Sequence, residues 1–129
     1  MTSSENLRGS FDPFVATLLD AALFGVDEKL GHDAVVLDLR ELVDSFDALV
    51  IASGRNDRQV RAIAEEVERR IDLALGVKPQ HVEGWPAGEW IALDYGDIIV
   101  HVFDEASREY YDLEHLWSAA EQHRPQPLG

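Results

Sequence analysis

The sequence has 129 residues, 46% of them hydrophobic, and 11 Lys and Arg against 25 Asp and Glu give a net charge of −14. This length predicts one domain, and the absence of cysteine excludes disulfides, thiolate catalysis and zinc–thiolate sites. No apolar run approaches the roughly 20 residues that a membrane span needs, and the N-terminus has neither a signal-peptide nor a transit-peptide pattern, so we expect a cytoplasmic protein with no membrane contact.

The charge also limits the kind of partner. Lys and Arg drive nucleic-acid binding by displacing counterions from phosphates, and a chain with a net charge of −14 repels a phosphate backbone. We therefore expect no direct, sequence-specific contact with nucleic acid, and any work near nucleic acid would go through a basic protein. The alternative is that the acidic surface only keeps the protein soluble.

The N-terminal part of the chain predicts a flexible start and one amphipathic helix. Residues 1–10 are polar and are expected to be flexible. Asp12-Pro13 is a good helix start, with Asp as the N-cap and Pro at the first helical position. Apolar residues then recur at helical spacing, and Gly25 is a plausible stop. We predict a helix from about Pro13 to Phe24 and a loop from Asp27 to Asp33.

Two strands and a long helix are expected next. Residues 34–39 form the first strand, and residues 48–52 are apolar without interruption, as in a central strand covered on both faces. A turn at 53–56 leads to a helix that starts with a capping box of Asn56 and Gln59 and ends at Gly76.

The C-terminal part predicts a hairpin followed by a helix. A short strand at 80–83 precedes strands from Trp90 and from Ile98, which a turn at Tyr95-Gly96 joins. The helix that follows Asp104 carries apolar residues on one face through Trp117. Residues 121–129 contain two Pro and are expected to be a disordered tail. Residues 11–120 thus form one α/β domain with a mixed sheet of about five strands and flanking helices.

The motifs of enzyme chemistry are weak or missing. Ser53 ends a strand before a helix, but the nucleophile-elbow pattern would need Gly where Ile51 and Arg55 stand. Ser53-Gly54 lacks the further glycines of the phosphate-binding and dinucleotide-binding loops. No predicted strand contains an Asp-x-Asp pattern, and the His and Glu residues do not follow the spacing of a metal site. We predict no catalytic residue, no metal and no cofactor.

The remaining hypothesis is a binding surface on the hairpin. If Trp90 or Tyr95 is exposed, Asp94 and Asp97 make an acidic rim around an aromatic anchor, which suits a basic protein. The alternative is that these rings belong to the core. For Phe103 and Trp117 the core is favoured.

Several stretches of the chain, taken together and in order, resemble the ribosomal silencing factor family (RsfS, also called Iojap). They run from a strand through the long helix to the hairpin and the last helix, and cover most of the chain. The matching stretches are Phe46–Gly54, Arg58–Ala64, Glu83-Gly84, Glu89–Asp97, Ile99–Phe103, Arg108–Glu114 and Leu116-Trp117.

The resemblance implies a function that composition does not. Members of this family bind the large ribosomal subunit through ribosomal protein L-fourteen, block its association with the small subunit, and so repress translation when nutrients are short. Their fold is that of nucleotidyltransferases without the catalytic carboxylates, and they can form homodimers. The resemblance and the expected exposure of the hairpin together assign the partner-binding residues as Trp90, Leu93, Asp94, Tyr95 and Asp97, with His101, Arg108 and Tyr110 shaping or extending the patch. The alternatives to this function are an active nucleotidyltransferase and an adaptor for another basic protein.

Overall fold

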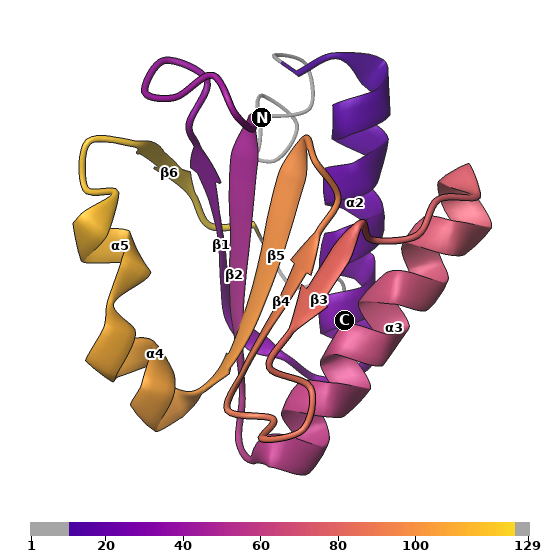
Figure 1. Cartoon of the computed structure of the whole chain (residues 1–129), viewed down its shortest axis with the longest axis vertical. Coiled ribbons are helices and arrows are strands. Elements are labelled where there is room, and N and C mark those ends of the chain that lie inside the picture. The colour runs from indigo at the N-terminus through magenta and orange to yellow at the C-terminus, as the bar shows by residue number, and fades with distance from the viewer. Residues whose placement is uncertain (1–10, 126–129) are drawn as a thin grey trace.

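The computed structural model describes residues 11–125, which form a single sheet with helices on both faces (Figure 1). The flexible start expected at residues 1–10 lies outside the described residues, and so do residues 126–129 of the tail expected at 121–129. The helices are α2 (Pro13–Glu28), α3 (Asp57–Leu75), α4 (Glu105–Tyr111) and α5 (Leu113–Leu116). The strands are β1 (His32–Asp38), β2 (Ala48–Gly54), β3 (His81–Glu83), β4 (Trp90–Asp94), β5 (Ile98–Asp104) and β6 (Glu121–His123).

The sheet is mixed, as predicted. Its strand order is β3-β4-β5-β2-β1-β6. The central pair β2 and β5 is parallel, and the other neighbouring pairs are antiparallel. All seven residues of β2 are buried, which confirms that the uninterrupted apolar run is a strand covered on both faces.

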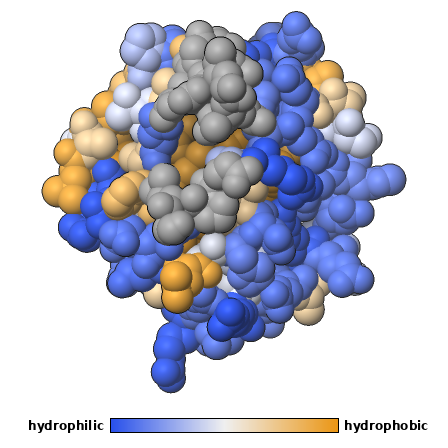
Figure 2. All heavy atoms as spheres, turned by 180° about the vertical axis from the view of Figure 1, so that it is seen from behind, coloured by the Kyte–Doolittle hydropathy of each residue, from blue (hydrophilic) through white to orange (hydrophobic). Residues whose placement is uncertain are grey.

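Two hydrophobic cores lie on opposite faces of the sheet. Helices α2 and α3 cover one face and bury the larger core, which includes Val50, Val100 and Val102 (Figure 1). Helices α4 and α5 lie on the other side, where Leu113 and Trp117 pack against the second core over β1 and β2. From behind, the surface is mostly hydrophilic, with hydrophobic residues gathered at the left edge, the side on which α2 and α3 lie (Figure 2). No described helix is long and apolar enough to cross a membrane.

Helix α2 starts where the sequence predicts but ends later. The Asp12 side chain accepts hydrogen bonds from the backbone N–H groups of Phe14 and Val15, and Pro13 follows it. The predicted stop at Gly25 is wrong, because the helix continues to Glu28. A Cβ at position 25 would lie 2.8 Å from Cα of Val67. Glycine is therefore present here to let α2 approach α3, and it does not end the helix.

Helix α3 agrees with its prediction at both ends. The Asn56 side chain accepts a hydrogen bond of 2.8 Å from the backbone N–H of Gln59. The Gln59 side chain in turn accepts a hydrogen bond from the backbone N–H of Arg55. At the other end Gly76 adopts a left-handed conformation with φ of 68°, as a glycine that terminates a helix commonly does.

The C-terminal region differs from its prediction in two ways. The single helix expected after Asp104 is broken at Asp112, whose φ is 47°, into α4 and α5. The shared apolar face predicted through Tyr110 and Trp117 is therefore wrong. The disordered tail predicted from residue 121 is also wrong at its start, because β6 pairs antiparallel with β1 and adds a sixth strand to the five expected.

Candidate partner-binding surface

One face of the sheet is only partly covered where β3, β4 and β5 lie. Along β4 and β5 buried side chains alternate with partly exposed ones, because successive side chains of a strand point to opposite faces. Apart from Phe103, the buried set faces α2 and α3. We call the other set the open face; its members are Trp90, Ala92, Asp94, Ile99 and His101.

Trp90 is the centre of an aromatic cluster at one end of the open face. Its ring is stacked on that of Phe103, with centroids 4.9 Å apart, and lies 4.6 Å from the ring of Tyr111 on α4. Phe103 is completely buried, whereas Trp90 remains partly exposed. Trp90 is thus held by its neighbours on β5 and α4, and part of its apolar ring remains exposed.

A hydrogen bond between two side chains fixes the orientation of the indole. Nε1–H of Trp90 donates to Nδ1 of His101 over 2.9 Å. Burial lowers the pKa of His101 to about 4, so the ring is neutral at neutral pH. Because Nδ1 accepts this bond, the proton of the neutral ring sits on Nε2.

The aromatic surface continues from the sheet onto helix α4. The ring of Tyr110 packs edge-on against Tyr111, with centroids 5.0 Å apart, and its side chain is 81% exposed. Tyrosine at so exposed a position offers a large, amphipathic contact area. Trp90, Tyr111 and Tyr110 therefore form a continuous aromatic shelf.

Carboxylates flank the rest of the open face. Glu83 on the edge strand β3 is exposed and pairs in register with Ala92. Asp94 is partly exposed and accepts a hydrogen bond of 2.8 Å from the backbone N–H of Gly96, and Asp97 is exposed. Burial and the nearby Asp97 also raise the pKa of Asp47, which indicates a locally negative environment at this end of the hairpin.

Two of the predicted contact residues are inside the molecule. Leu93 is 0% exposed and Tyr95 is 7% exposed, and both belong to the core beneath α2 and α3. The expectation that their side chains lie on the surface is wrong, because strand alternation turns Leu93 away from Trp90. The hydroxyl group of Tyr95 finds no hydrogen-bond partner among the described residues.

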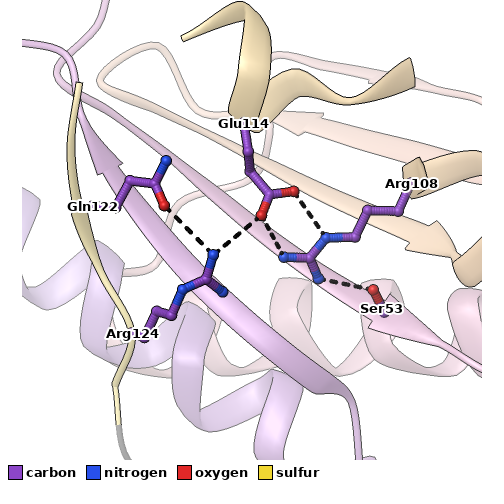
Figure 3. Close-up of polar contacts among 5 residues, drawn as sticks. All are labelled: Ser53, Arg108, Glu114, Gln122 and Arg124. Atoms are coloured by element: carbon purple, nitrogen blue, oxygen red, sulfur yellow. Dashed lines mark hydrogen bonds and ion pairs between the residues drawn. The ribbon is translucent and has the colours of Figure 1, made fainter. Parts of the chain in front are cut away.

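Arg108 is engaged in an internal network (Figure 3). Its guanidinium donates from Nε and Nη2 to the carboxylate of Glu114, at 3.1 and 3.2 Å, and from Nη1 to Oγ of Ser53 at 2.8 Å. Arg124 reaches the same carboxylate at 3.4 Å. Arg108 thus connects α4, α5 and the end of β2, and its side chain is only 11% exposed. It can shape the surface by holding α4 in place, but it presents little charge to a partner.

The structure therefore regroups the predicted site residues. Trp90 and His101 are in contact, and Tyr110 joins them through Tyr111. Asp94 pairs in register with Ile99 at the other end of β4. Tyr111 and Ile99 also belong to this surface, although neither is among the predicted site residues. The alternation of β4 and β5, applied strictly, would have found Ile99, whereas the contact of Tyr111 with Trp90 depends on how α4 packs.

The chemistry available here is that of a binding surface. No group of three or more His, Asp or Glu among residues 11–125 is placed to hold a metal ion. The side chains offer aromatic area, one neutral imidazole and several carboxylates. Such a combination fits a partner that brings both apolar and cationic groups.

Comparison with known proteins gives one consistent family. The family model described as "Ribosomal silencing factor during starvation" matches residues 14–128. The chain is 36% identical over 104 residues to the ribosomal silencing factor RsfS of Bacillus subtilis, covering 81% of this chain and 87% of that protein. It is 37% identical over 121 residues to the RsfS of Zymomonas mobilis, covering 94% and 89%. A crystal structure of a protein from Chromobacterium violaceum superposes with a TM-score of 0.75 at 34% identity, covering 87% of this chain and 90% of that one.

Proposed function

The chain belongs to the ribosomal silencing factor family, and we propose that it binds the large ribosomal subunit through ribosomal protein L-fourteen and sterically blocks association with the small subunit. Membership of the family makes it a ribosome-associated regulator of translation. The proposed step would repress translation when nutrients are limiting.

The observation that supports this proposal best is the open face with its aromatic shelf. Trp90 is braced by Phe103 and by the hydrogen bond to His101, so little side-chain entropy is lost when a partner covers it. Burying one large ring contributes roughly 2–3 kcal/mol. This contact would anchor the protein on the apolar part of its partner.

The charge of the chain would select the partner. Ribosomal proteins are generally basic, and a net charge of −14 attracts such a protein and repels bare RNA. Asp97 and Glu83 are exposed beside the open face and can meet Lys or Arg. Charges at the edge of an interface mainly raise the association rate and the dependence on salt.

The proposed block of subunit association is steric and requires no chemical reaction at the site. A folded domain that occupies the face of one subunit excludes the other by volume alone. Sedimentation through a density gradient measures this directly. Added protein should move joined ribosomes into separate subunits, and the protein should sediment with the large one.

A charge reversal beside the open face, compared with one on the other side of the sheet, tests the specificity of binding. Asp97→Lys and Glu65→Lys change the net charge equally, but Glu65 is exposed on α3, on the opposite side of the sheet. We expect Asp97→Lys to weaken co-sedimentation by about tenfold and Glu65→Lys to have little effect. Equal behaviour of the two variants would remove the open face as the binding surface. Subunits that still join in the presence of saturating protein would favour an adaptor for another basic protein.

A further inference from the structure

Three cations that form no ion pair lie at one corner of the molecule. Of the 11 Lys and Arg in the sequence, Arg8 lies outside the described residues, which leaves ten. Seven of these ten form an ion pair of 3.4 Å or less: Arg40, Arg61, Arg69, Arg70, Lys78, Arg108 and Arg124. The other three, Lys29, Arg55 and Arg58, are exposed and form no ion pair within residues 11–125. We call these three residues the basic corner.

The side chain of Gln59 joins the segments that carry the basic corner. Its Nε2–H group donates to the backbone oxygens of Lys29 and Leu30, at 3.0 and 3.1 Å. Its Oε1 accepts a hydrogen bond of 2.6 Å from the backbone N–H of Arg55. Arg58 directly precedes Gln59 in the first turn of α3. One amide group therefore connects the end of α2 to the start of α3 and gathers cations from both segments around it.

The carboxylates next to the basic corner in sequence are already engaged. Glu28 contacts Arg70 at 3.0 Å, and Asp57 contacts Arg61 at 2.8 Å. Asp27 also has an interaction of its own. The charge that remains unpaired where α2 ends and α3 begins is therefore positive, although the chain as a whole is acidic.

The other carboxylates are directed elsewhere or lie far away. Asp33 lines a hollow around Arg108 together with acidic residues of α4, on the side of the sheet opposite α2 and α3 (Figure 1). Asp47 and Asp97 meet at the start of β2, where the backbone N–H of Asp47 donates to the oxygen of Asp97. The length of β2 places them about 20 Å from the end of that strand, which is more than twice the screening length of about 8 Å at physiological salt.

The basic corner and the aromatic shelf are at the same end of the sheet. Trp90 pairs in register with Phe103, and Phe103 pairs in register with Ser53. Two strand spacings, about 10 Å, therefore separate Trp90 from Ser53. Arg55 follows two residues later, where β2 leads into α3 at the bottom of Figure 1. Whatever surrounds a partner on the aromatic shelf is thus brought close to the basic corner.

We propose that the basic corner binds the phosphate backbone of RNA on the large ribosomal subunit, beside the protein that the open face contacts; this choice of ligand rests on the proposed function. Because ribosomal proteins are generally basic, the anions on a ribosomal surface are chiefly RNA phosphates. The guanidinium group of Arg matches phosphate with two parallel hydrogen bonds. Such contacts position a protein and carry no sequence information.

The net charge of −14 makes RNA binding weak until another contact holds the chain on the subunit. The open face would supply that contact. Two linked contacts then act together, because the first raises the effective concentration of the second. The basic corner would therefore orient the chain on the subunit more than it would recruit the chain from solution.

A titration with short RNA tests the basic corner without the ribosome. The ligand is an oligouridylate of about six nucleotides, added to the isotope-labelled full chain and followed by NMR shifts of the backbone amides. We expect weak, saturable shifts centred on the basic corner, and about tenfold weaker binding by the double variant Arg55→Gln/Arg58→Gln. The control Arg69→Gln/Lys78→Gln removes the same charge from positions that are 57% and 73% exposed, and should bind RNA like wild type. Equal thermal melts show that both variants fold.

A photocrosslink identifies what lies beside the basic corner on the subunit. The sequence has no cysteine, so Leu30→Cys, at a 78% exposed position next to Lys29, carries a single photoactivatable label. We expect this label to attach to RNA when the chain is bound to the large subunit. Leu73→Cys, at a 67% exposed position near the other end of α3, is the control and should give a much lower yield of RNA crosslink.

The proposal is overturned by RNA-induced shifts that are absent or centred elsewhere, or by an Arg55→Gln/Arg58→Gln variant that binds RNA like wild type. A label at position 30 that attaches only to protein would assign the basic corner to an acidic protein segment instead, and equal RNA yields from positions 30 and 73 would also refute it. A wild-type chain that does not bind the large subunit would refute the proposed function, whereas the RNA titration would still decide whether the basic corner binds phosphate.

Discussion

The indole N–H of Trp90 donates a 2.9 Å hydrogen bond to Nδ1 of His101, across the paired strands β4 and β5. This contact requires an unprotonated Nδ1, and burial lowers the pKa of His101 to about 4. Above the usual pKa of about 6.5 the ring is neutral in both the folded and the unfolded chain. As the pH falls towards 4, only the unfolded chain takes up this proton, so folding stability falls.

The first prediction is a pH dependence carried by His101. Between about pH 6.5 and pH 4 this group should lower the free energy of unfolding by up to about 3 kcal/mol, and little further below that range. Urea unfolding at a series of pH values, in wild type and His101→Gln, measures the difference. Ala92→Ser, at the position that pairs with His101 across the strands, removes no titratable group, is the control and should keep the wild-type slope. A His101→Gln slope identical to wild type would contradict the assignment.

The second prediction separates binding from stability at the aromatic shelf. Tyr110 is 81% exposed, so Tyr110→Ala should change the free energy of unfolding by less than about 0.5 kcal/mol. It should nevertheless weaken co-sedimentation with the large subunit by about tenfold, because an aromatic anchor is lost. Leu30→Ala removes a side chain that is 78% exposed, between α2 and β1, and should bind like wild type. Undiminished binding of Tyr110→Ala would exclude it from the interface.

The third prediction concerns the network around Arg108. Among the described residues, Arg108→Ala leaves the mostly buried Glu114 carboxylate with the longer contact to Arg124 alone. It should therefore lower the free energy of unfolding by about 2–3 kcal/mol. Arg124→Ala, at a 56% exposed position, should cost less than about 0.5 kcal/mol. The Arg108 guanidinium holds the pKa of Glu114 below its usual value. The stability that this ion pair contributes is therefore present at pH values above the usual pKa of Glu and is lost as the pH falls through the lowered pKa. A double-mutant cycle with Glu114→Gln that shows no coupling would refute the network.

The fourth prediction follows from the buried hydroxyl of Tyr95. Burial, with smaller effects of Glu68 and Asp72, raises the pKa of this phenol, and the hydroxyl has no partner among the described residues. Removing an unsatisfied buried polar group relieves its desolvation cost. Tyr95→Phe should therefore leave stability unchanged or raise it by up to about 1 kcal/mol, whereas Tyr95→Ala should lower it by about 3–5 kcal/mol. Chemical denaturation distinguishes these outcomes, and a destabilised Tyr95→Phe would reveal a partner for the hydroxyl.

Features coded by neighbouring residues were predicted correctly from the sequence. The cap at Asp12, the whole of α3 and the hairpin from β4 to β5 all depend on local signals: a side chain that caps a helix, a periodic apolar face, or a glycine in a turn. The apolar run of β2 likewise predicted its central position in the sheet.

The predictions that were wrong concern features that depend on contacts between residues far apart in the sequence. The helix breaks at Asp112, where no Gly or Pro in the sequence indicates a break. Strand β6 forms by pairing with the edge of β1, a contact that the local sequence does not predict. In the candidate site, Leu93 was grouped with Trp90 by closeness in sequence, although the two point to opposite faces of β4. Tyr111 was missed because its contact with Trp90 depends on the packing of α4 against the sheet.

The fifth prediction tests the close approach of α2 and α3 at Gly25. In an exposed helix, alanine is more stable than glycine by roughly 1 kcal/mol. At position 25, however, the new Cβ would lie 2.8 Å from Cα and 2.9 Å from N of Val67, and the backbone of α3 cannot rotate away as a flexible side chain can. Gly25→Ala should therefore destabilise the fold by about 1–3 kcal/mol, the cost of overpacking a core.

Gly76→Ala is the matched comparison. A Cβ there has no atom within 4 Å, but φ is 68°, so the only cost is the left-handed conformation, about 1 kcal/mol. The two variants should also differ in the spacing of the helices, since only Gly25→Ala pushes α2 away from α3. Amide shifts of residues 17–24 should change in Gly25→Ala and remain at wild-type positions in Gly76→Ala. A Gly25→Ala protein that is as stable as wild type would mean that the helices do not pack as closely as their backbones indicate.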